Sequence, residues 1–441
     1  MGQPTAVRAP GAWPVLGRAP ALMRRPLRFL TSLPELGPLV QLRLGPLSAY
    51  IVTTPELTRQ VLVTGAQDFE RGRFSRKLTR TLGAGLATTS GQQHRTQRRM
   101  LQPAFSRTAV AACAEPMRSA AESVLSEWTP GRVIDINKAM DAYASDVVAR
   151  SLFGSQVAAP AAVEFRHSLP GLLRDMVNRT LLPEWWAGLP TPGNRRAARD
   201  LARVDAAAHA AITAYRAADR GAGDLLSLLV AARDEDGTGL SDTQVRDQMV
   251  TFTLAGVETT GATLAWFFHE LAHHPEVERR VLDEIDAVLG GRAPALDDLP
   301  ALTETTHALL ECTRLYASWI QMRRATRPVV LDGVELPAGT EVIYSPYLLH
   351  HDPRWFPAPE AFDPDRWNAD RAGVIPNGAY VAFSAGVHKC IGESFAFLEA
   401  VTFAVMACQR WRLRPVPGAP VRPVATGVVH PKGLVMSVTP R

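Results

Sequence analysis

The sequence predicts a mainly α-helical fold with a small β portion, and three observations support this class. Alanine-rich amphipathic runs recur along the chain, with apolar side chains at helical spacing. Alternating patterns typical of strands are confined to about 35–60, 320–350 and a C-terminal segment. Strands so far apart must meet in space to form a sheet. We therefore expect a single interwoven domain over residues 1–441.

Two hairpins are expected in the β portion. The stretch Leu39–Thr54 alternates and is interrupted by Gly45-Pro46. The stretch Thr326–Pro346 contains Asp332-Gly333, a dipeptide that favours two-residue hairpin turns. Loops are expected at 183–194, 234–239 and 289–300, where glycine, proline and aspartate gather.

Helices are predicted at about 107–128, 136–154, 196–218 and 241–273. The last begins at the capping residues Ser241 and Asp242, ends before Pro275, and would span about 50 Å. Its middle, Ala255–Gly261, reads AGVETTG and combines residues that are poor helix formers. It is either a tolerated weak spot or a local bulge whose backbone or threonine hydroxyl serves a ligand. The acid beside a hydroxyl favours the bulge.

Composition limits the classes of protein. Hydrophobic residues make up 46% and charged residues 21%, which is typical of a globular chain. The four cysteines include no CxxC pair, which argues against a disulfide scaffold or structural zinc site and favours a reducing, cytoplasmic setting. Because the N-terminal segment has no apolar run of about 18 residues, we expect a soluble protein without membrane anchor or signal peptide.

The net charge is +5, and arginines gather at 23–26, 94–99 and 323–327. Each cluster is either a solvated surface or an anion site. No recognition module or interleaved aromatic pattern accompanies them, so we expect no nucleic-acid binding.

One short motif suggests zinc. His269, Glu270 and His273 match H-E-x-x-H, in which two histidines on one helix face hold the metal and the glutamate is the general base. The extended form of the motif is absent, and only a downstream glutamate such as Glu284 could be a third ligand. The alternative is a polar helix end, where histidines lie near the carbonyl-rich terminus. A zinc hydrolase is therefore a remote alternative.

A second motif surrounds Cys390, in FSAGVHKCIGESFA. Glycines allow a tight backbone, an aromatic ring shields the sulfur, and basic residues and a downstream helix N-terminus stabilise a thiolate. The residues concerned are Phe383, Gly386, His388, Lys389 and Gly392. A thiolate in such a loop is either a nucleophile or a single axial metal ligand.

The pattern F-x-x-G-x-H-x-C-x-G, followed by Ala396 and Glu399, resembles the haem-binding loop of the cytochrome P450 family. The resemblance implies haem b as cofactor and Cys390 as the axial ligand of its iron, lying between Phe383, Gly386 and Gly392. Thiolate donation to haem iron favours cleavage of the O–O bond.

Further motifs resemble the same family. The sequence ECTR resembles its E-x-x-R motif, and FDPDRW resembles the segment that completes it. The resemblance implies a structural network of Glu311, Arg314 and Arg366 behind the cysteine loop. The Asp365 in that segment replaces a common glutamate.

The resemblance also assigns residues to the haem propionates and to oxygen chemistry. HRTQRR implies that His94 and Arg98 bind a propionate, with His388 and Arg323 as further partners; Arg324 is the alternative to Arg323. AGVETT implies that Glu258 relays protons and that Thr259 assists oxygen activation. Ala255 and Val257 are implied to contact substrate.

The implied protein is a soluble bacterial-type haem-thiolate monooxygenase, with haem between the long central helix and the cysteine loop. It would insert one oxygen atom from O2 into a hydrophobic small molecule, by hydroxylation or epoxidation, with a terpenoid or another secondary metabolite as the candidate substrate. We expect a monomer that receives electrons from a ferredoxin and ferredoxin reductase, with Lys389 near the docking surface. Alternatives are peroxide-driven oxidation, oxidative coupling, or a haem sensor.

The segments expected to line the pocket are 70–92, 165–185, 317–322 and 427–430. One departs from the family pattern, because Ala317-Ser318 replaces consecutive prolines and the segment is a residue shorter.

Overall fold

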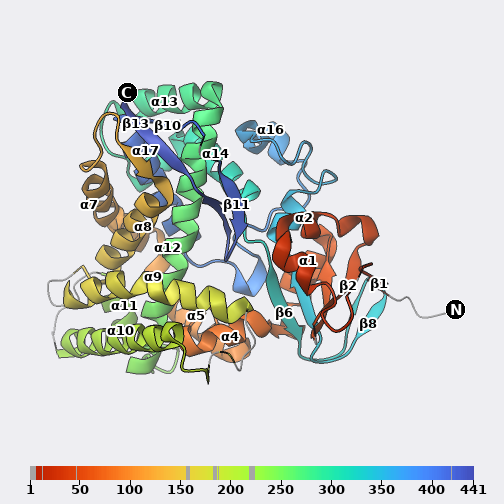
Figure 1. Ribbon diagram of the computed structural model, residues 1–441. Helices are drawn as coiled ribbons and strands as arrows, with labels where there is room; N and C mark the ends of the chain where they lie inside the picture. Colours follow the sequence, from red (N-terminus) through yellow and green to blue (C-terminus); the bar gives the residue numbers. More distant parts are fainter. Residues whose placement is uncertain are drawn as a thin grey trace. The chain divides into compact units, whose positions relative to one another are not determined.

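The computed structural model describes residues 6–11, 13–45, 47–154, 159–181, 186, 188–217, 224–418 and 420–441. The chain divides into two compact units, each assembled from segments far apart in the sequence. Unit 1 comprises Met1–Arg76, Leu310–Cys390 and Pro423–His430, and unit 2 comprises Lys77–Leu309, Ile391–Arg422 and Pro431–Arg441. Helices predominate and strands are few, which confirms the predicted fold class (Figure 1).

Unit 1 is built on a six-stranded sheet of order β1-β2-β3-β9-β6-β4. Its strands are β1 (Val7–Arg8), β2 (Leu39–Leu44), β3 (Leu47–Val52), β4 (Phe69–Arg71), β6 (Gln321–Ala325) and β9 (Glu341–Tyr344). The parallel pairing of β3 with β9 joins the two distant strand-rich segments, as expected. Short helices α1 (Ala19–Arg24) and α2 (Pro26–Thr31) lie beside this sheet (Figure 1).

Both predicted hairpins are present in unit 1. Strands β2 and β3 pair antiparallel, with Leu39 opposite Val52. Strands β7 (Val329–Leu331) and β8 (Val334–Leu336) flank the Asp332-Gly333 turn. Both turn residues have positive φ, 49° and 74°. This matches the type I′ geometry whose twist suits a two-residue hairpin.

The remaining helices of unit 1 are short: α3 (Pro55–Arg59), α15 (Pro346–His350) and α16 (Ala369–Ala372). A π-helical turn at Gln60–Thr64 follows α3. Two helices cross the boundary between the units, α4 (Arg73–Leu82) and α14 (Thr303–Leu315), as do strands β11 (Arg422–Ala425) and β12 (Val429–Lys432).

Unit 2 is organised around α12 (Asp242–His273), the longest described helix. It begins with a capping box in which Ser241 and Gln244 bond reciprocally to each other's backbone N–H, at 3.2 and 2.9 Å. It ends at His273, just before Pro275, as predicted. Its partner α8 (Ile136–Leu152) approaches closely at glycines. A Cβ on Gly256 would lie 3.0 Å from Val148, and one on Gly261 would lie 2.4 Å from Asp141.

The other elements of unit 2 surround this pair, with α9 and α10 packed side by side (Figure 1). The helices are α5 (Gly91–Leu101), α6 (Arg107–Ala112), α7 (Ala114–Leu125), α9 (Ala159–Leu181), α10 (Pro192–Ala217), α11 (Leu225–Ala231), α13 (Pro275–Leu289) and α17 (Glu393–Cys408). A three-stranded sheet has the order β10 (Trp411–Pro415), β13 (Val435–Pro440), β5 (Val133–Asp135).

Three predictions about helices need correction. The helix expected at 107–128 is two helices, because Cys113 donates to the carbonyl of Val110 in an i to i+3 turn. The helix expected from 196 begins at Pro192, after Thr191 accepts a hydrogen bond from Asn194 N–H as a cap. The bulge favoured within Ala255–Gly261 is absent, and the segment is continuous α-helix.

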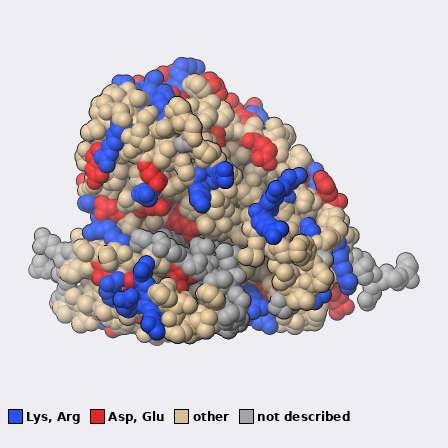
Figure 2. Space-filling view, viewed as in Figure 1, with Lys and Arg blue, Asp and Glu red and all other residues tan. Residues whose placement is uncertain are grey.

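The surface carries both signs of charge. Lysine and arginine side chains are interspersed with aspartate and glutamate over the face shown in Figure 2. Many pair locally, such as Arg118 with Glu115 and Arg279 with Asp283. The basic side chains on this face are therefore mostly of the solvated, mixed-charge kind.

Candidate active site

The part of the cysteine loop up to Cys390 belongs to unit 1 and has a specific backbone path. Cys390 N–H donates to the carbonyl of Phe383 at 2.8 Å, and Lys389 N–H donates to Gly386 at 3.0 Å. Gly386 has φ of +63°, and a Cβ there would lie 2.0 Å from the carbonyl oxygen of Leu62. Only glycine fits this position, as the predicted role of Gly386 requires. Gly392 directly precedes α17, so Cys390 lies just before a helix N-terminus.

The four cysteines differ in environment. Cys312 and Cys408 are buried, and Cys113 is half-buried. Burial raises the pKa of Cys113, and raises that of Cys408 to about 12. These thiols are protonated at neutral pH and unsuited to metal ligation. Cys390 is exposed, on a glycine-bearing loop, and is the cysteine whose surroundings suit a ligand.

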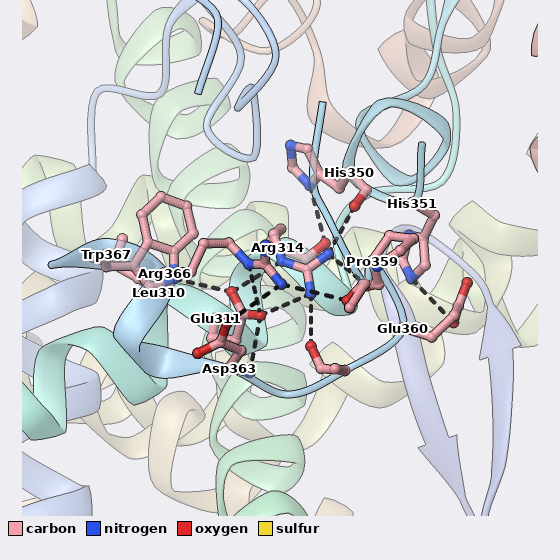
Figure 3. A network of polar contacts seen from close by, with 12 residues as sticks. Leu310, Glu311, Arg314, His350, His351, Pro359, Glu360, Asp363, Arg366 and Trp367 are labelled. Atoms are coloured by element: carbon pink, nitrogen blue, oxygen red, sulfur yellow. Dashed lines mark hydrogen bonds and ion pairs between the residues drawn. The ribbon is translucent and has the colours of Figure 1, made fainter. Parts of the chain in front are cut away.

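A buried charge network lies in the same unit, and the structure brings together Glu311, Arg314 and Arg366 (Figure 3). Arg314 donates two hydrogen bonds to the carboxylate of Glu311, of 2.9 and 2.8 Å. Arg366 Nε donates to the same carboxylate at 3.3 Å. These three side chains are at most 3% exposed. Buried charges are tolerated only when paired and hydrogen-bonded in this way.

The network has members that the sequence did not reveal. Trp367 Nε1 donates to Glu311 at 3.0 Å, and Asp363 N–H donates to it at 3.2 Å. Arg314 also donates to the backbone carbonyls of His350, Pro359 and Ala361. The guanidinium therefore ties helix α14 to the loop of residues 350–361 (Figure 3).

His350 links this network to the chain leading into the cysteine loop. Its Nδ1 lies 3.0 Å from the carbonyl of Arg314, and its Nε2 accepts from Val381 N–H at 3.0 Å. Nδ1 must therefore carry the proton. The imidazole is fully buried and stacks on Tyr380. Burial and the Arg314 charge lower the pKa of His350 well below its usual value, so it remains neutral.

Arg323 lies on β6 and is 3% exposed. Its guanidinium lies over the ring of Tyr344 and donates to Tyr344 Oη at 3.3 Å. That hydroxyl is 3.1 Å from Ser384 Oγ in the cysteine loop. Arg324, on the opposite face of the strand, is paired in register with Glu341. Of the two arginines, Arg323 is therefore the one connected to the cysteine loop.

The other predicted propionate partners are distributed over both units. His388 is in unit 1, half-buried in the 3-10 turn Gly386–His388. His94 and Arg98 are in unit 2, one turn apart on α5, and His94 is 2% exposed. Residues at i and i+4 share a helix face, so these two can serve one anion.

The centre of α12, in unit 2, presents a distinct face. Ala255 and Thr259 are exposed, one turn apart, on a helix that is otherwise largely buried. Thr259 Oγ1 donates to the carbonyl of Ala255 at 3.0 Å, and Glu258 is half-buried beside it. Val257 is only 2% exposed and packs in the apolar core of the unit. Of the two predicted substrate contacts, Ala255 is thus the one with an exposed side chain.

Thr260, the next residue, points into the interior of unit 2. Its hydroxyl donates to Glu399 Oε2 of α17 at 3.2 Å. Burial raises the pKa of the Glu399 carboxyl well above its usual value. No sequence pattern predicted this bond, which fixes α12 against α17.

These residues fit a haem. One exposed thiol on a glycine loop can supply one axial ligand, arginine and histidine side chains can bind two carboxylates, and Ala255 with Thr259 offers a small, weakly polar helix face. A family comparison decides the matter: the model of the family described as Cytochrome P450 matches residues 7–438. The chain belongs to the cytochrome P450 family.

Known P450 relatives match nearly the whole chain. "Cyclooctat-9-en-7-ol 5-monooxygenase" of Streptomyces melanosporofaciens is 45% identical, over 94% of this chain and 91% of the relative. "Pentalenene oxygenase" of Streptomyces avermitilis is 40% identical, over 98% and 97%. "Cyclooctatin synthase" of S. melanosporofaciens is 41% identical, over 94% and 91%. The protein is therefore a cytochrome P450 monooxygenase, and its cofactor is haem b.

Solved structures agree on the fold. The haem domain of cytochrome P450DA superposes with a TM-score of 0.88 at 24% identity, covering 99% of this chain and 98% of that one. Cyanobacterial CYP120A1 with retinoic acid bound gives the same score and identity over all of both chains. None of the described helices is long and apolar enough to cross a membrane.

The H-E-x-x-H match is a helix end in this P450. His273 Nδ1 lies 2.7 Å from the carbonyl of His269, and His274 pairs with Glu270 at 3.4 Å. Burial and the two neighbouring histidines lower the pKa of His269 to about 4. Among the residues that the structure describes, no three potential ligands gather around a common metal position. Family membership removes the zinc-hydrolase alternative.

Proposed function

We propose that this P450 oxidises a cyclic terpenoid in secondary metabolism, by hydroxylation or epoxidation. The observation that carries the proposal is the set of three relatives, at least 40% identical over at least 91% of their length. Their names describe oxidation of cyclooctat-9-en-7-ol, oxygenation of pentalenene and synthesis of cyclooctatin. A substrate of this kind is largely hydrocarbon and needs an apolar pocket.

Three of the expected pocket segments have contacts within the two units. In unit 1, Ser318 forms a bridge with Val428, which brings segments 317–322 and 427–430 together. Trp319 Nε1 donates to Thr426 in the same place. In unit 2, Leu82 and Leu86 join the apolar core beside Leu254. Part of segment 165–185 lies outside the described residues.

In the proposed assignment, Cys390 would hold the haem iron and Phe383 would shield its sulfur, while Gly386 and Gly392 give the loop its path. His94, Arg98, Arg323 and His388 bind the propionates. When bound, haem supplies the redox-active iron at which O2 is reduced and from which one oxygen atom reaches the substrate. The network of Glu311, Arg314 and Arg366 holds the loop that presents the thiolate.

Residues of α12 transfer the protons that this reaction consumes. Thr259 Oγ1 can donate to or accept from a neighbouring group once its bond to the Ala255 carbonyl is exchanged. Glu258, one residue earlier, is only half-buried and can take up a proton from water and pass it on. Ala255, on the exposed face, leaves room for the substrate.

Electrons come from a separate protein, which we propose to be a ferredoxin with its reductase. Lys389 is exposed next to Cys390, where an acidic partner would dock. The enzyme acts as a monomer in the cytoplasm in this proposal. Reduction rates of Lys389→Glu with an acidic ferredoxin, at several salt concentrations, test the docking. A rate and salt dependence equal to wild type would contradict it.

The function is tested in two stages. The reduced, carbon-monoxide-bound enzyme should show the strongly red-shifted Soret band of thiolate-ligated haem, and Cys390→Ser should abolish it. A panel of cyclic terpenoids should then be screened for displacement of iron-bound water and for products that incorporate labelled dioxygen. Binding of fatty acids or aromatic compounds but of no terpenoid would overturn the proposed substrate class. Label arriving only from peroxide would favour the peroxide-driven alternative.

A further inference from the structure

A short loop of unit 2, Gly83–Leu86, is held by two buried side chains of α12. Ala84 N–H donates to Asp247 Oδ2 at 2.7 Å, and Leu86 N–H donates to Gln248 Oε1 at 3.0 Å. Asp247 is 4% exposed and Gln248 is fully buried. The loop therefore takes its backbone partners from a helix more than 160 residues away in sequence.

The fit between loop and helix is close enough to require glycine. Gly83 has φ of +62°, and a Cβ there would lie 2.0 Å from Asp247 Oδ1. A Cβ on Gly85 would lie 2.3 Å from Thr251 Oγ1. Glycine gives the loop this approach but leaves it with much conformational freedom in the absence of partners. The two buried acceptors therefore determine where the loop lies.

Arg246 is the third buried side chain of α12 at this loop. We call Arg246, Asp247 and Gln248 together the clamp. Its Nη1 donates to Asp247 Oδ1 at 2.9 Å and to the carbonyl of Thr81 at 3.3 Å. Its Nε donates to Asp205 of α10 at 2.6 Å. Arg246 is 7% exposed, so each charge is compensated by the other. One carboxylate oxygen of Asp247 thus binds Arg246, while the other remains available for Ala84.

The loop and the residue just before it place apolar side chains in the core of unit 2. Leu82 and Leu86 are at most 6% exposed and belong to the same cluster as Leu254 and Val257 of α12. Leu254 directly precedes Ala255, the exposed residue proposed to contact substrate. A shift of the loop would therefore alter the apolar core to which Leu254, the neighbour of that contact, belongs.

We propose that Arg246 and Asp247 are positioning residues that set substrate orientation, by fixing the loop Gly83–Leu86 against α12. The proposal rests on the proposed function, because it places the substrate beside Ala255. It does not involve the cysteine loop or the propionate ligands. The clamp controls which carbon of a bound substrate is presented for oxidation, while haem ligation is independent of it.

The test compares three variants of the holoenzyme. Asp247→Ala removes the acceptor of Ala84, whereas Asp247→Asn retains a carbonyl oxygen there. Glu284→Ala is the matched control, since Glu284 accepts from the backbone N–H groups of Glu304 and Thr305 at 2.6 and 3.0 Å in the same unit. Three quantities are measured: hydrogen exchange of residues 82–90, the ratio of oxidation products, and the carbon-monoxide spectrum.

Asp247→Ala should accelerate exchange in 82–90 at least tenfold and change the product ratio at least threefold, with an unaltered carbon-monoxide spectrum. In Asp247→Asn, the exchange rate of residues 82–90 and the product ratio should both lie much closer to wild type than in Asp247→Ala. In Glu284→Ala, both quantities should equal the wild-type values. If Asp247→Ala does not fold, Gln248→Met, which removes the acceptor of Leu86 at similar volume, replaces it with the same expectations.

Two results would overturn the proposal. One is loop exchange in Asp247→Ala no faster than in Glu284→Ala. The other is a loosened loop with an unchanged product ratio. Failure of the proposed function is distinguishable, because wild-type enzyme would then give no terpenoid product while the exchange measurement still reports on the clamp.

Discussion

The cysteine-loop region of unit 1 and the α12 region of unit 2 are stabilised in different ways. The first depends on buried charge: the guanidinium of Arg314 makes five hydrogen bonds, to Glu311 and to three backbone carbonyls. The second, at the centre of α12 and away from the Arg246–Asp247 pair nearer its N-terminus, depends mainly on apolar packing and close helix contacts at Gly256 and Gly261. A network of directed bonds fixes one geometry, which suits the presentation of a ligand. Apolar packing leaves the exposed face of α12 free to be specified by a few side chains.

This contrast predicts the largest effect for Glu311→Gln. The substitution leaves Arg314 and Arg366 as buried charges without an anion, which should cost about 3–5 kcal/mol of unfolding free energy. Urea unfolding and the yield of thiolate-ligated haem measure it. The control is Glu122→Gln. At an exposed site, Glu122 accepts two hydrogen bonds from the guanidinium of Arg410, and the substitution removes this ion pair. That pair should contribute about 0–1 kcal/mol. Equal losses in the two variants would contradict the contrast.

The next effect concerns His350→Phe. The ring would still fill the space beside Tyr380, but Val381 N–H and the carbonyl of Arg314 would lose their partner. A buried polar group left unsatisfied costs about 1–3 kcal/mol. We also expect part of the carbon-monoxide complex to lose its red-shifted band, because residue 381 leads into the cysteine loop. A stable variant with a wild-type spectrum would show that His350 only fills space.

A smaller, graded effect is expected from pH. Burial lowers the pKa of His269 to about 4 and of His351 to about 3, and lowers that of His350 as well. Below about pH 6.5 the unfolded chain binds protons that the folded protein does not. Stability should therefore fall with decreasing pH, by about 1.4 kcal/mol per pH unit for each histidine, until the folded pKa is reached.

Urea unfolding at several pH values between about 7 and 5 measures this slope. His351→Gln should reduce it by one histidine's share. An unchanged slope in His351→Gln would contradict the assignment of a neutral, buried imidazole.

The smallest effect on the unfolding free energy is expected at Thr259, in the α12 region of unit 2. Thr259→Ala removes one exposed hydroxyl and should change the unfolding free energy by less than about 0.5 kcal/mol. It should nevertheless separate consumption of reducing equivalents from product formation, because proton delivery is impaired. The ratio of product to NAD(P)H consumed is the measurement, with Thr263→Ala as control, since Thr263 bonds in the same way to the carbonyl of Thr259. Intact coupling in Thr259→Ala would remove its proposed role.

The sequence predicted the site best where chemistry imposes fixed spacing. The glycines around Cys390 and the pair Glu311 and Arg314 are local patterns, and their meaning does not depend on distant contacts. His350 and Asp247 could not be found in this way. Each acts through the N–H of a residue far away in the chain, and any histidine or aspartate in a buried segment would look the same.

The errors in the prediction have a similar origin. AGVETTG contains poor helix formers, yet α12 continues through it, because close packing on α8 outweighs the intrinsic preference. The H-E-x-x-H pattern was correctly interpreted as a helix end, with zinc binding as a remote alternative, because two histidines on a helix bind a metal only when a third ligand lies nearby. That information belongs to the fold rather than to the motif.

The glycine contacts between α8 and α12 also limit how α12 can move relative to α8. A screw motion of α12 by one residue, about 1.5 Å along its axis with a rotation of about 100°, would bring the Cβ of Ala255 or Val257 opposite Val148, and that of Thr260 or Ala262 opposite Asp141. A Cβ at these two positions would approach to 3.0 and 2.4 Å. Close packing at the two glycines therefore opposes this motion and helps to set the position of Thr259 relative to α8.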